Sequence, residues 1–175
     1  MKLKLLTLSA AAMFAPGIAI AQGAPVADAF RENEASAAKN LIAAAEEIPV
    51  AKYTYKPTPA QMSVADIQVH LAQGNDYLCG GIAGVKAPTR TEMKATAPKA
   101  DLVARLKETF EFCNTALKSL DDSKLAEQVD FFGGKRTRAS VMTLTTADWA
   151  DHYSQIANYM RLNGMLPPTA KKPQP

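Results

Sequence analysis

The sequence predicts an all-α fold, a four-helix bundle with up-down helices and one long connection. Apolar residues recur with the spacing of an α-helix in four long segments, and almost no segment alternates with the two-residue period of a β-strand. Stretches that contain proline or glycine separate these segments. Because four helices that each carry an apolar stripe must bury the stripes against one another, a bundle around one core is expected.

The first helix is expected over residues 27–48, which are rich in alanine and glutamate, and Pro49 ends it. The second helix opens at Ser63 and runs to the glycine pair at residues 80–81. Its start resembles a capping box because Asp66 lies three residues after Ser63, although aspartate replaces the usual glutamate or glutamine.

A long connection follows the second helix and contains Pro88 and Pro98, neither of which suits a helix interior. The third helix is expected over residues 100–120. Asp121 and the polar residues after it break this helix, and a short helical turn is expected near Leu125.

The glycine pair at residues 133–134 marks a turn, and the fourth helix is expected over residues 137–163. Gly164 is placed to end that helix, and the proline pair at residues 167–168 prevents its continuation. Residues 169–175 have the composition of a polar, proline-rich tail. Residues 22–168 are long enough for one domain with a core.

Residues 1–21 have the pattern of a secretory signal peptide. Lys2 and Lys4 precede an apolar run over residues 5–20, and Ala19 and Ala21 are the small residues that a signal peptidase reads. A retained N-terminal anchor is the alternative, but the run is shorter than the ~20 residues of a membrane-spanning helix. We therefore expect cleavage before Gln22, a periplasmic or secreted location, and no stable membrane insertion afterwards.

The charge of the mature chain argues against nucleic-acid binding. Without residues 1–21 it has 18 basic and 17 acidic side chains, so it lacks the strongly basic surface of nucleic-acid-binding proteins. The one basic cluster, Lys135, Arg136 and Arg138, has two interpretations. It is either a solvated loop that leads into a helix or an anion site at the helix N-terminus.

Cys79 and Cys113 are the only two cysteines. Exported proteins keep disulfides, and two cysteines allow a single intramolecular pairing. We favour a Cys79–Cys113 disulfide over two free thiols.

The two histidines of the chain, His70 and His152, are both expected on the core side of their helices. Asp148 lies four residues before His152 and therefore on the same helical face. Buried without partners, these groups would destabilise the fold, so they must hydrogen-bond to one another or share a metal ion. Spacing alone favours hydrogen-bonded structural residues, with a metal site in the bundle as the alternative.

Two segments resemble motifs of a known family. Residues 151–156 read DHYSQI and residues 159–168 read YMRLNGMLPP, which together resemble the C-terminal signature of the DinB superfamily. Residues 63–72 read SVADIQVHLA and, with Asn75 after them, resemble the other motif of that family, a helix that carries the first histidine. The resemblance extends over essentially the whole mature chain.

The resemblance implies a DinB-like four-helix bundle with a divalent metal site, generally built from three histidines. His70 and His152 match the first and last of these histidines, and the middle position falls on Asp148. Either Asp148 is a ligand, for Zn, Fe, Mn or Ni, or the site has decayed and Asp148 accepts a hydrogen bond from His152. Gln155 matches the signature as a residue that orients a ligand.

Two functions remain open. The resemblance implies a metal-dependent enzyme acting on a small molecule, because the superfamily includes thiol-dependent transferases and isomerases. A transferase is therefore one expectation, but a hydrolase is favoured because an exported protein does not meet the low-molecular-weight thiols of the cytoplasm. The sequence contains no Ser-His-Asp order, no glycine-rich phosphate loop and no CxxC motif, so any catalysis would depend on the metal. The alternative is a non-enzymatic exported bundle that binds a small ligand or a partner protein. The resemblance also implies a homodimer.

Overall fold

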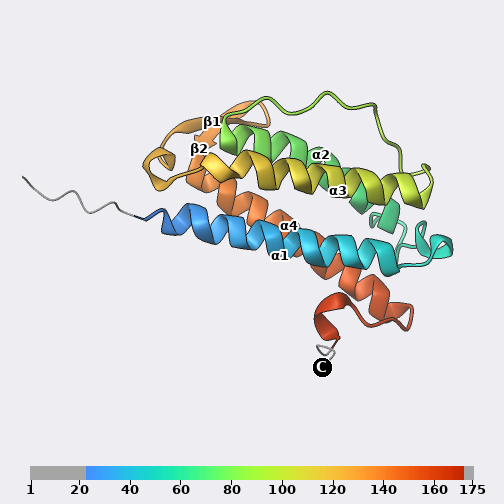
Figure 1. Ribbon diagram of the computed structural model, residues 1–175. Coiled ribbons are helices and arrows are strands. Elements are labelled where there is room, and N and C mark those ends of the chain that lie inside the picture. The colour runs from blue at the N-terminus through green and yellow to red at the C-terminus, as the bar shows by residue number, and fades with distance from the viewer. Residues whose placement is uncertain (1–22, 172–175) are drawn as a thin grey trace, which may run out of the picture.

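The computed structural model describes residues 23–171 and confirms an all-α fold with four long helices (Figure 1). The expected signal peptide and the last four residues lie outside the described part. The helices are α1 (Pro25–Glu47), α2 (Val64–Ala83), α3 (Lys99–Ala116) and α4 (Arg138–Leu162). Short 3-10 turns η1 (Val50–Lys52), η2 (Leu117–Ser119), η3 (Asp122–Lys124) and η4 (Pro168–Ala170) lie between and after them.

The predicted helix boundaries agree with the structure to within a few residues because local signals determine them. The Ser63 hydroxyl accepts from the Asp66 N–H at 3.1 Å, and the Asp66 carboxylate accepts from the Ser63 N–H at 3.0 Å. This is a complete capping box with aspartate in the glutamate position. Gly84 follows α2 with a positive φ of 70°, the left-handed conformation that ends helices.

The long connection over residues 84–98 determines the order of helix directions. Asn75 of α2 hydrogen-bonds to Thr109 of α3, and Cys79, four residues later, is bonded to Cys113, also four residues later. These neighbours therefore run parallel, and the order of directions is up-down-down-up (Figure 1). A parallel neighbour requires the chain to return along the ~30 Å of α2, which explains the length of the connection.

Residues 128–137 form a β-hairpin that the sequence analysis did not predict. Strand β1 (Gln128–Phe131) pairs antiparallel with β2 (Gly134–Thr137). The two loop residues, Phe132 and Gly133, both have positive φ, 44° and 81°, as a type I′ hairpin turn requires. The expectation of no strands was therefore wrong here. Each strand has only four residues, and β2 is polar. Strands of this length are too short for a two-residue period to be recognised in the sequence.

The basic cluster belongs to this hairpin and to the start of α4. Lys135 lies 3.1 Å from Asp130 on the opposite strand. Arg138 is buried and lies 2.8 Å from the Glu127 carboxylate. The third member, Arg136, lies over the Phe131 ring at 5.3 Å. Because two of the three charges are paired with carboxylates, the structure favours a structural role over an anion site.

Trp149 is at the centre of the core. Its ring stacks on Phe30 of α1 at 5.6 Å and packs against Phe110 of α3 at 6.0 Å between centroids. Its indole N–H donates to the Asn75 side chain of α2 at 2.8 Å. Through this side chain, α4 therefore contacts each of the other three helices. Aliphatic side chains fill the space around it, among them Ile67, Leu71, Leu102, Leu106, Leu117, Ile156 and Met160.

The predicted disulfide is present: Cys79 and Cys113 are bonded, with their Cα atoms 5.2 Å apart. It joins the C-terminal halves of α2 and α3. At the other end of the molecule, η4 packs beside α4, where the Tyr153 hydroxyl donates to Thr169 at 2.9 Å. None of the helices over residues 23–171 is long and apolar enough to cross a membrane.

Glu34 is a buried carboxyl group between α1 and α3. The residue is only 2% exposed, and its Oε1 atom has no hydrogen-bond partner. Burial raises the pKa of Glu34 to about 7; a hydrogen bond from Asn114 opposes this shift, and the charge of Glu111 adds to it. The folded state therefore favours the protonated form of this side chain.

We predict that removing the disulfide destabilises the chain strongly. The bond closes a loop over a sequence separation of 34 residues, for which loop-closure entropy gives about 3–4 kcal/mol. Urea unfolding should show this loss in the Cys79→Ala/Cys113→Ala variant and in the wild type with reductant. The reductant should leave the double variant unchanged. An equal unfolding midpoint in reduced and oxidised wild type would contradict the prediction.

We predict that Glu34→Gln stabilises the protein at high pH. Because the folded-state pKa lies above the unfolded value of 4.5, the wild type loses stability as the pH rises from about 4.5 to about 7. At pH 8 the variant should gain on the order of 2 kcal/mol in free energy of unfolding, and at pH 4 almost nothing. Glu32→Gln, an exposed position on the same helix, is the control. Parallel pH curves for wild type and Glu34→Gln would refute the assignment.

Candidate metal centre

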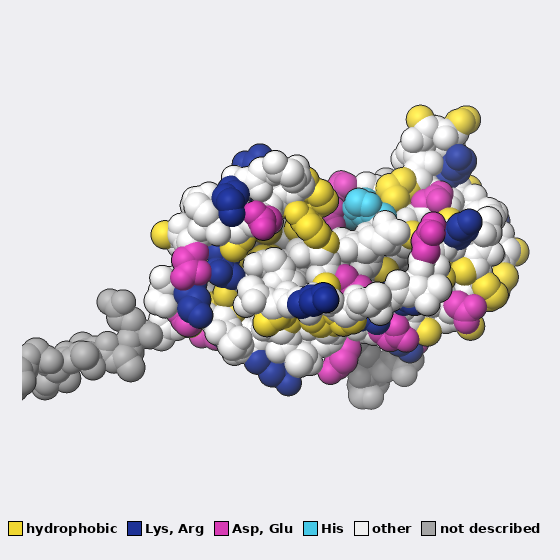
Figure 2. Space-filling model, turned by 90° about the horizontal axis from the view of Figure 1, so that it is seen from above, with side chains coloured by type: hydrophobic (Ala, Val, Ile, Leu, Met, Phe, Trp, Pro, Cys, Tyr) yellow, Lys and Arg dark blue, Asp and Glu magenta, His cyan; other side chains and the backbone are white. Residues whose placement is uncertain are grey.

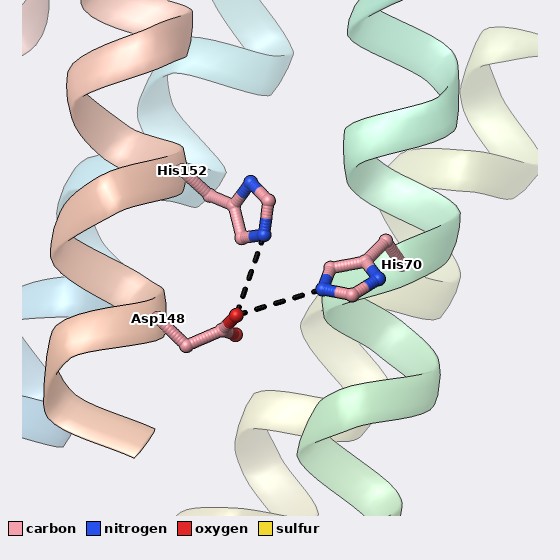
Figure 3. Close-up of side chains that lie close together, drawn as sticks. All are labelled: His70, Asp148 and His152. Atoms are coloured by element: carbon pink, nitrogen blue, oxygen red, sulfur yellow. Dashed lines mark ion pairs between the residues drawn. The ribbon is translucent and has the colours of Figure 1, made fainter. Parts of the chain in front are cut away.

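Three predicted side chains from two helices meet at one point of the structure. His70 comes from α2, and Asp148 and His152 come from successive turns of α4 (Figure 3). The Asp148 Oδ1 atom lies 3.5 Å from His70 Nε2 and 3.4 Å from His152 Nε2. The two imidazole rings are 4.6 Å apart between centroids. The carboxylate thus lies between two imidazole nitrogens that both point toward it.

The three side chains differ in burial. His152 is 8% exposed, Asp148 is 30% exposed and His70 is 47% exposed. The expectation that both histidines lie on the core side is therefore correct for His152 and wrong for His70. His70 is on the flank of α2 that faces α4, at the edge of the core stripe formed by Ile67 and Leu71. The group is consequently open to solvent on one side, and Figure 2 shows histidine at the molecular surface.

The charge of Asp148 is stabilised by its two neighbours. Burial alone would raise the pKa of this carboxyl group, but hydrogen bonds and positive charge from His152, and then from His70, outweigh burial and lower the pKa. Asp148 is therefore a carboxylate, the form that a metal ion needs from it.

The register between α2 and α4 depends on the residue next to Asp148. Trp149 donates to Asn75, which lies five residues after His70 on α2. Both groups are buried, so breaking this bond would leave polar atoms without partners. The bond holds the two antiparallel helices in the alignment that brings His70 opposite Asp148.

The donor set fits a divalent metal ion. Two imidazole nitrogens and one carboxylate oxygen are ligands of Zn, Fe(II), Mn and Ni, and one such atom from each residue lies within 4.8 Å of the others. Ligand atoms about 2.1 Å from a tetrahedral ion are about 3.4 Å apart, which matches both distances to Asp148. In the described part of the chain, residues 23–171, no other group of three such residues is present.

His152 differs in one respect from a typical metal-ligating histidine. Its Nδ1 atom is buried and has no hydrogen-bond partner, whereas a ligating histidine usually donates from its second nitrogen to a carboxylate or carbonyl. Gln155, expected to orient a ligand, does not take this place. Its amide donates to Asp151 on the exposed side of α4 at 2.7 Å.

One contact of α2, two turns after His70, was not expected from the sequence. The Tyr77 hydroxyl accepts from the Phe132 N–H at 2.8 Å, and their rings are 4.8 Å apart. Tyr77 therefore joins α2 to the tip of the hairpin. Because the hairpin was not predicted, no partner for Tyr77 could be identified from sequence.

Three solved structures of bacterial proteins have a similar fold. A DinB-like protein of Bacillus subtilis matches with a TM-score of 0.65 and 21% identity, covering 83% of this chain and 99% of its own. A DinB-like protein of Bacillus cereus has a TM-score of 0.67 and 15% identity, covering 81% and 95%. A conserved protein of Enterococcus faecalis has a TM-score of 0.63 and 18% identity, covering 78% and 96%.

No curated protein matches the sequence. The family model of the DinB superfamily matches residues 35–156. This match runs from the middle of α1 through all three residues of the candidate metal centre to the last part of α4. The chain belongs to the DinB superfamily.

Proposed function

We propose that this chain is an exported metalloprotein that binds one divalent metal ion through His70, Asp148 and His152, and uses it in a hydrolytic reaction on a small molecule. The observation that carries the proposal is the convergence of three ligand atoms from α2 and α4 within 4.8 Å. The family match over the residues that position them adds support.

The residues around the centre suit a reaction at an open metal position. A bound divalent ion would polarise a substrate carbonyl or lower the pKa of a bound water. Asp148 is held ionised by the two imidazoles, and half-exposed His70 leaves an approach from solvent. Thiol chemistry by the protein itself receives no support, because the described residues contain no free cysteine.

One observation favours a second function, a non-enzymatic exported bundle with a decayed metal site that binds a small ligand or a partner protein. The buried Nδ1 atom of His152 has no partner to orient it, and Asp148 already lies within 3.5 Å of both imidazoles. In this alternative, the three residues form an ion-pair cluster that holds α2 against α4.

We predict that protein purified without a chelating column contains about one divalent metal ion per chain. Inductively coupled plasma mass spectrometry should find this ion in the wild type and lose most of it in His70→Ala. His70 is half-exposed, so its loss should leave the fold intact. Asp151→Ala, which removes an exposed carboxylate beside His152, is the matched control and should retain the metal.

Asp148→His separates the two functions. This variant supplies the third histidine implied by the family pattern. It should bind Zn(II) whether the natural site is functional or decayed. If the wild type stays free of metal under all loading conditions while Asp148→His takes up Zn(II), the site of the natural chain is decayed and the metalloenzyme proposal is wrong.

We also predict that the exported chain starts at Gln22. Expression of the full sequence in a Gram-negative host should yield a periplasmic protein whose intact mass corresponds to residues 22–175. A membrane-bound product that retains residues 1–21 would show an uncleaved anchor and contradict the proposed location.

A further inference from the structure

Phe132 has an unfavourable backbone conformation at an exposed position. Its φ of 44° is in the left-handed region, where a bulky residue is an outlier and asparagine or glycine is normal. Its side chain is 71% exposed, so burial in the core does not compensate. An exposed aromatic ring held in a strained turn is an observation that suggests a function.

The ring of Phe132 is part of a fixed aromatic surface. Its centroid lies 4.8 Å from that of the Tyr77 ring and 4.8 Å from that of the Phe131 ring. The Tyr77 hydroxyl holds the Phe132 N–H, and the Arg136 guanidinium lies over the Phe131 ring at 5.3 Å. We call Tyr77, Phe131 and Phe132 the aromatic cluster. Its members restrain one another, so the surface is formed before anything binds.

This cluster and the metal centre lie on the same flank of α2. Tyr77 follows His70 by seven residues, which is two helical turns or ~10 Å along the helix. Gly74 lies between them, and a Cβ atom there would meet only the Leu78 side chain, at 4.0 Å. The surface of α2 at Gly74 is therefore not covered by another element.

The facing helix, α4, presents one exposed apolar side chain here. Leu144 precedes Asp148 by one turn of α4 and is 40% exposed. Seen from above, hydrophobic side chains gather beside the histidine, toward the end of the bundle where the hairpin lies (Figure 2). Other exposed apolar side chains, such as Leu162 and Leu166, lie at or just after the C-terminal end of α4 and are not continuous with this strip.

We propose that the substrate is an amphiphilic small molecule with a metal-binding carbonyl or carboxylate head and an apolar arm of ~10 Å that ends in a ring or branched group. The inference rests on the proposed metal centre. The head would be held at His70, Asp148 and His152, and the arm would lie over Gly74 and Leu144 and end against the aromatic cluster. A small molecule fits better than a protein surface because the strip starts at the metal centre and extends only ~10 Å along α2 to Tyr77.

Two hydroxamates on the zinc-loaded protein test this proposal by isothermal titration calorimetry. The affinity of acetohydroxamate measures binding of the head to the metal alone. 6-Phenylhexanohydroxamate has the same head and adds an apolar arm that is long enough to reach the aromatic cluster. The arm should tighten binding by at least about tenfold, because it buries several methylene groups and a ring. In Phe132→Asn the arm should increase the affinity by less than about threefold, while acetohydroxamate should bind as tightly as it binds the wild type.

The variants are chosen to keep the fold. Asparagine accepts positive φ, so Phe132→Asn should unfold no earlier than the wild type. Tyr77→Phe keeps the ring and removes only the hydroxyl that holds the hairpin, so it should lose part of the affinity that the arm adds. Leu166→Asn removes an exposed apolar side chain away from the strip, so it should keep all of that affinity.

The outcomes separate this inference from the proposed function. If acetohydroxamate does not bind the zinc-loaded wild type, the proposed function fails and the inference fails with it. If acetohydroxamate binds but the arm adds nothing, or Phe132→Asn keeps the full gain, only the inference is overturned. A dimer that becomes a monomer in Phe132→Asn, seen by light scattering, would assign the cluster to a second copy of the chain and also overturn it.

Discussion

The hydrogen bond from Trp149 to Asn75 is the contact on which the rest of the structure depends. It is buried, and it fixes the register between α2 and α4 beside the point where Asp148 meets His70. The same indole ring packs against Phe30 and Phe110, so α1 and α3 are aligned by the same side chain. A core built only from aliphatic side chains would tolerate sliding more readily, because apolar contacts have no direction.

Two further constraints act on the same helices. The disulfide and the long connection keep α2 and α3 parallel, and the hydroxyl of Tyr77 fixes the hairpin against α2. Helix α2 is thus held against α3, α4 and the hairpin. This explains how a half-exposed residue such as His70 can lie opposite two residues of α4 in a defined geometry. The candidate metal centre lies at the edge of the core, where it is open to solvent.

Much of this fold could be predicted from the sequence, and the reasons for the failures are physical. Helical periodicity and local signals such as Ser63, Asp66 and Gly164 located all four helices. The hairpin was missed because its strands are four residues long and its turn uses Phe132 where asparagine is normal. The exposure of His70 was misjudged because each helical residue rotates by about 100°. A residue next to the apolar stripe is therefore buried or exposed according to which neighbour packs there, and sequence periodicity does not specify that neighbour. The grouping of His70, Asp148 and His152 was predicted through the family resemblance, whereas spacing alone favoured structural hydrogen bonds.

A crystal structure of the Zn(II)-loaded protein, with anomalous scattering recorded at the zinc edge, would show whether His70, Asp148 and His152 bind a metal ion. We expect one strong anomalous peak about 2.0–2.2 Å from His70 Nε2, His152 Nε2 and an Asp148 carboxylate oxygen, with an open position toward solvent. A zinc-saturated crystal in which Asp148 remains paired with both imidazoles, with no peak between them, would rule out a metal site at these residues.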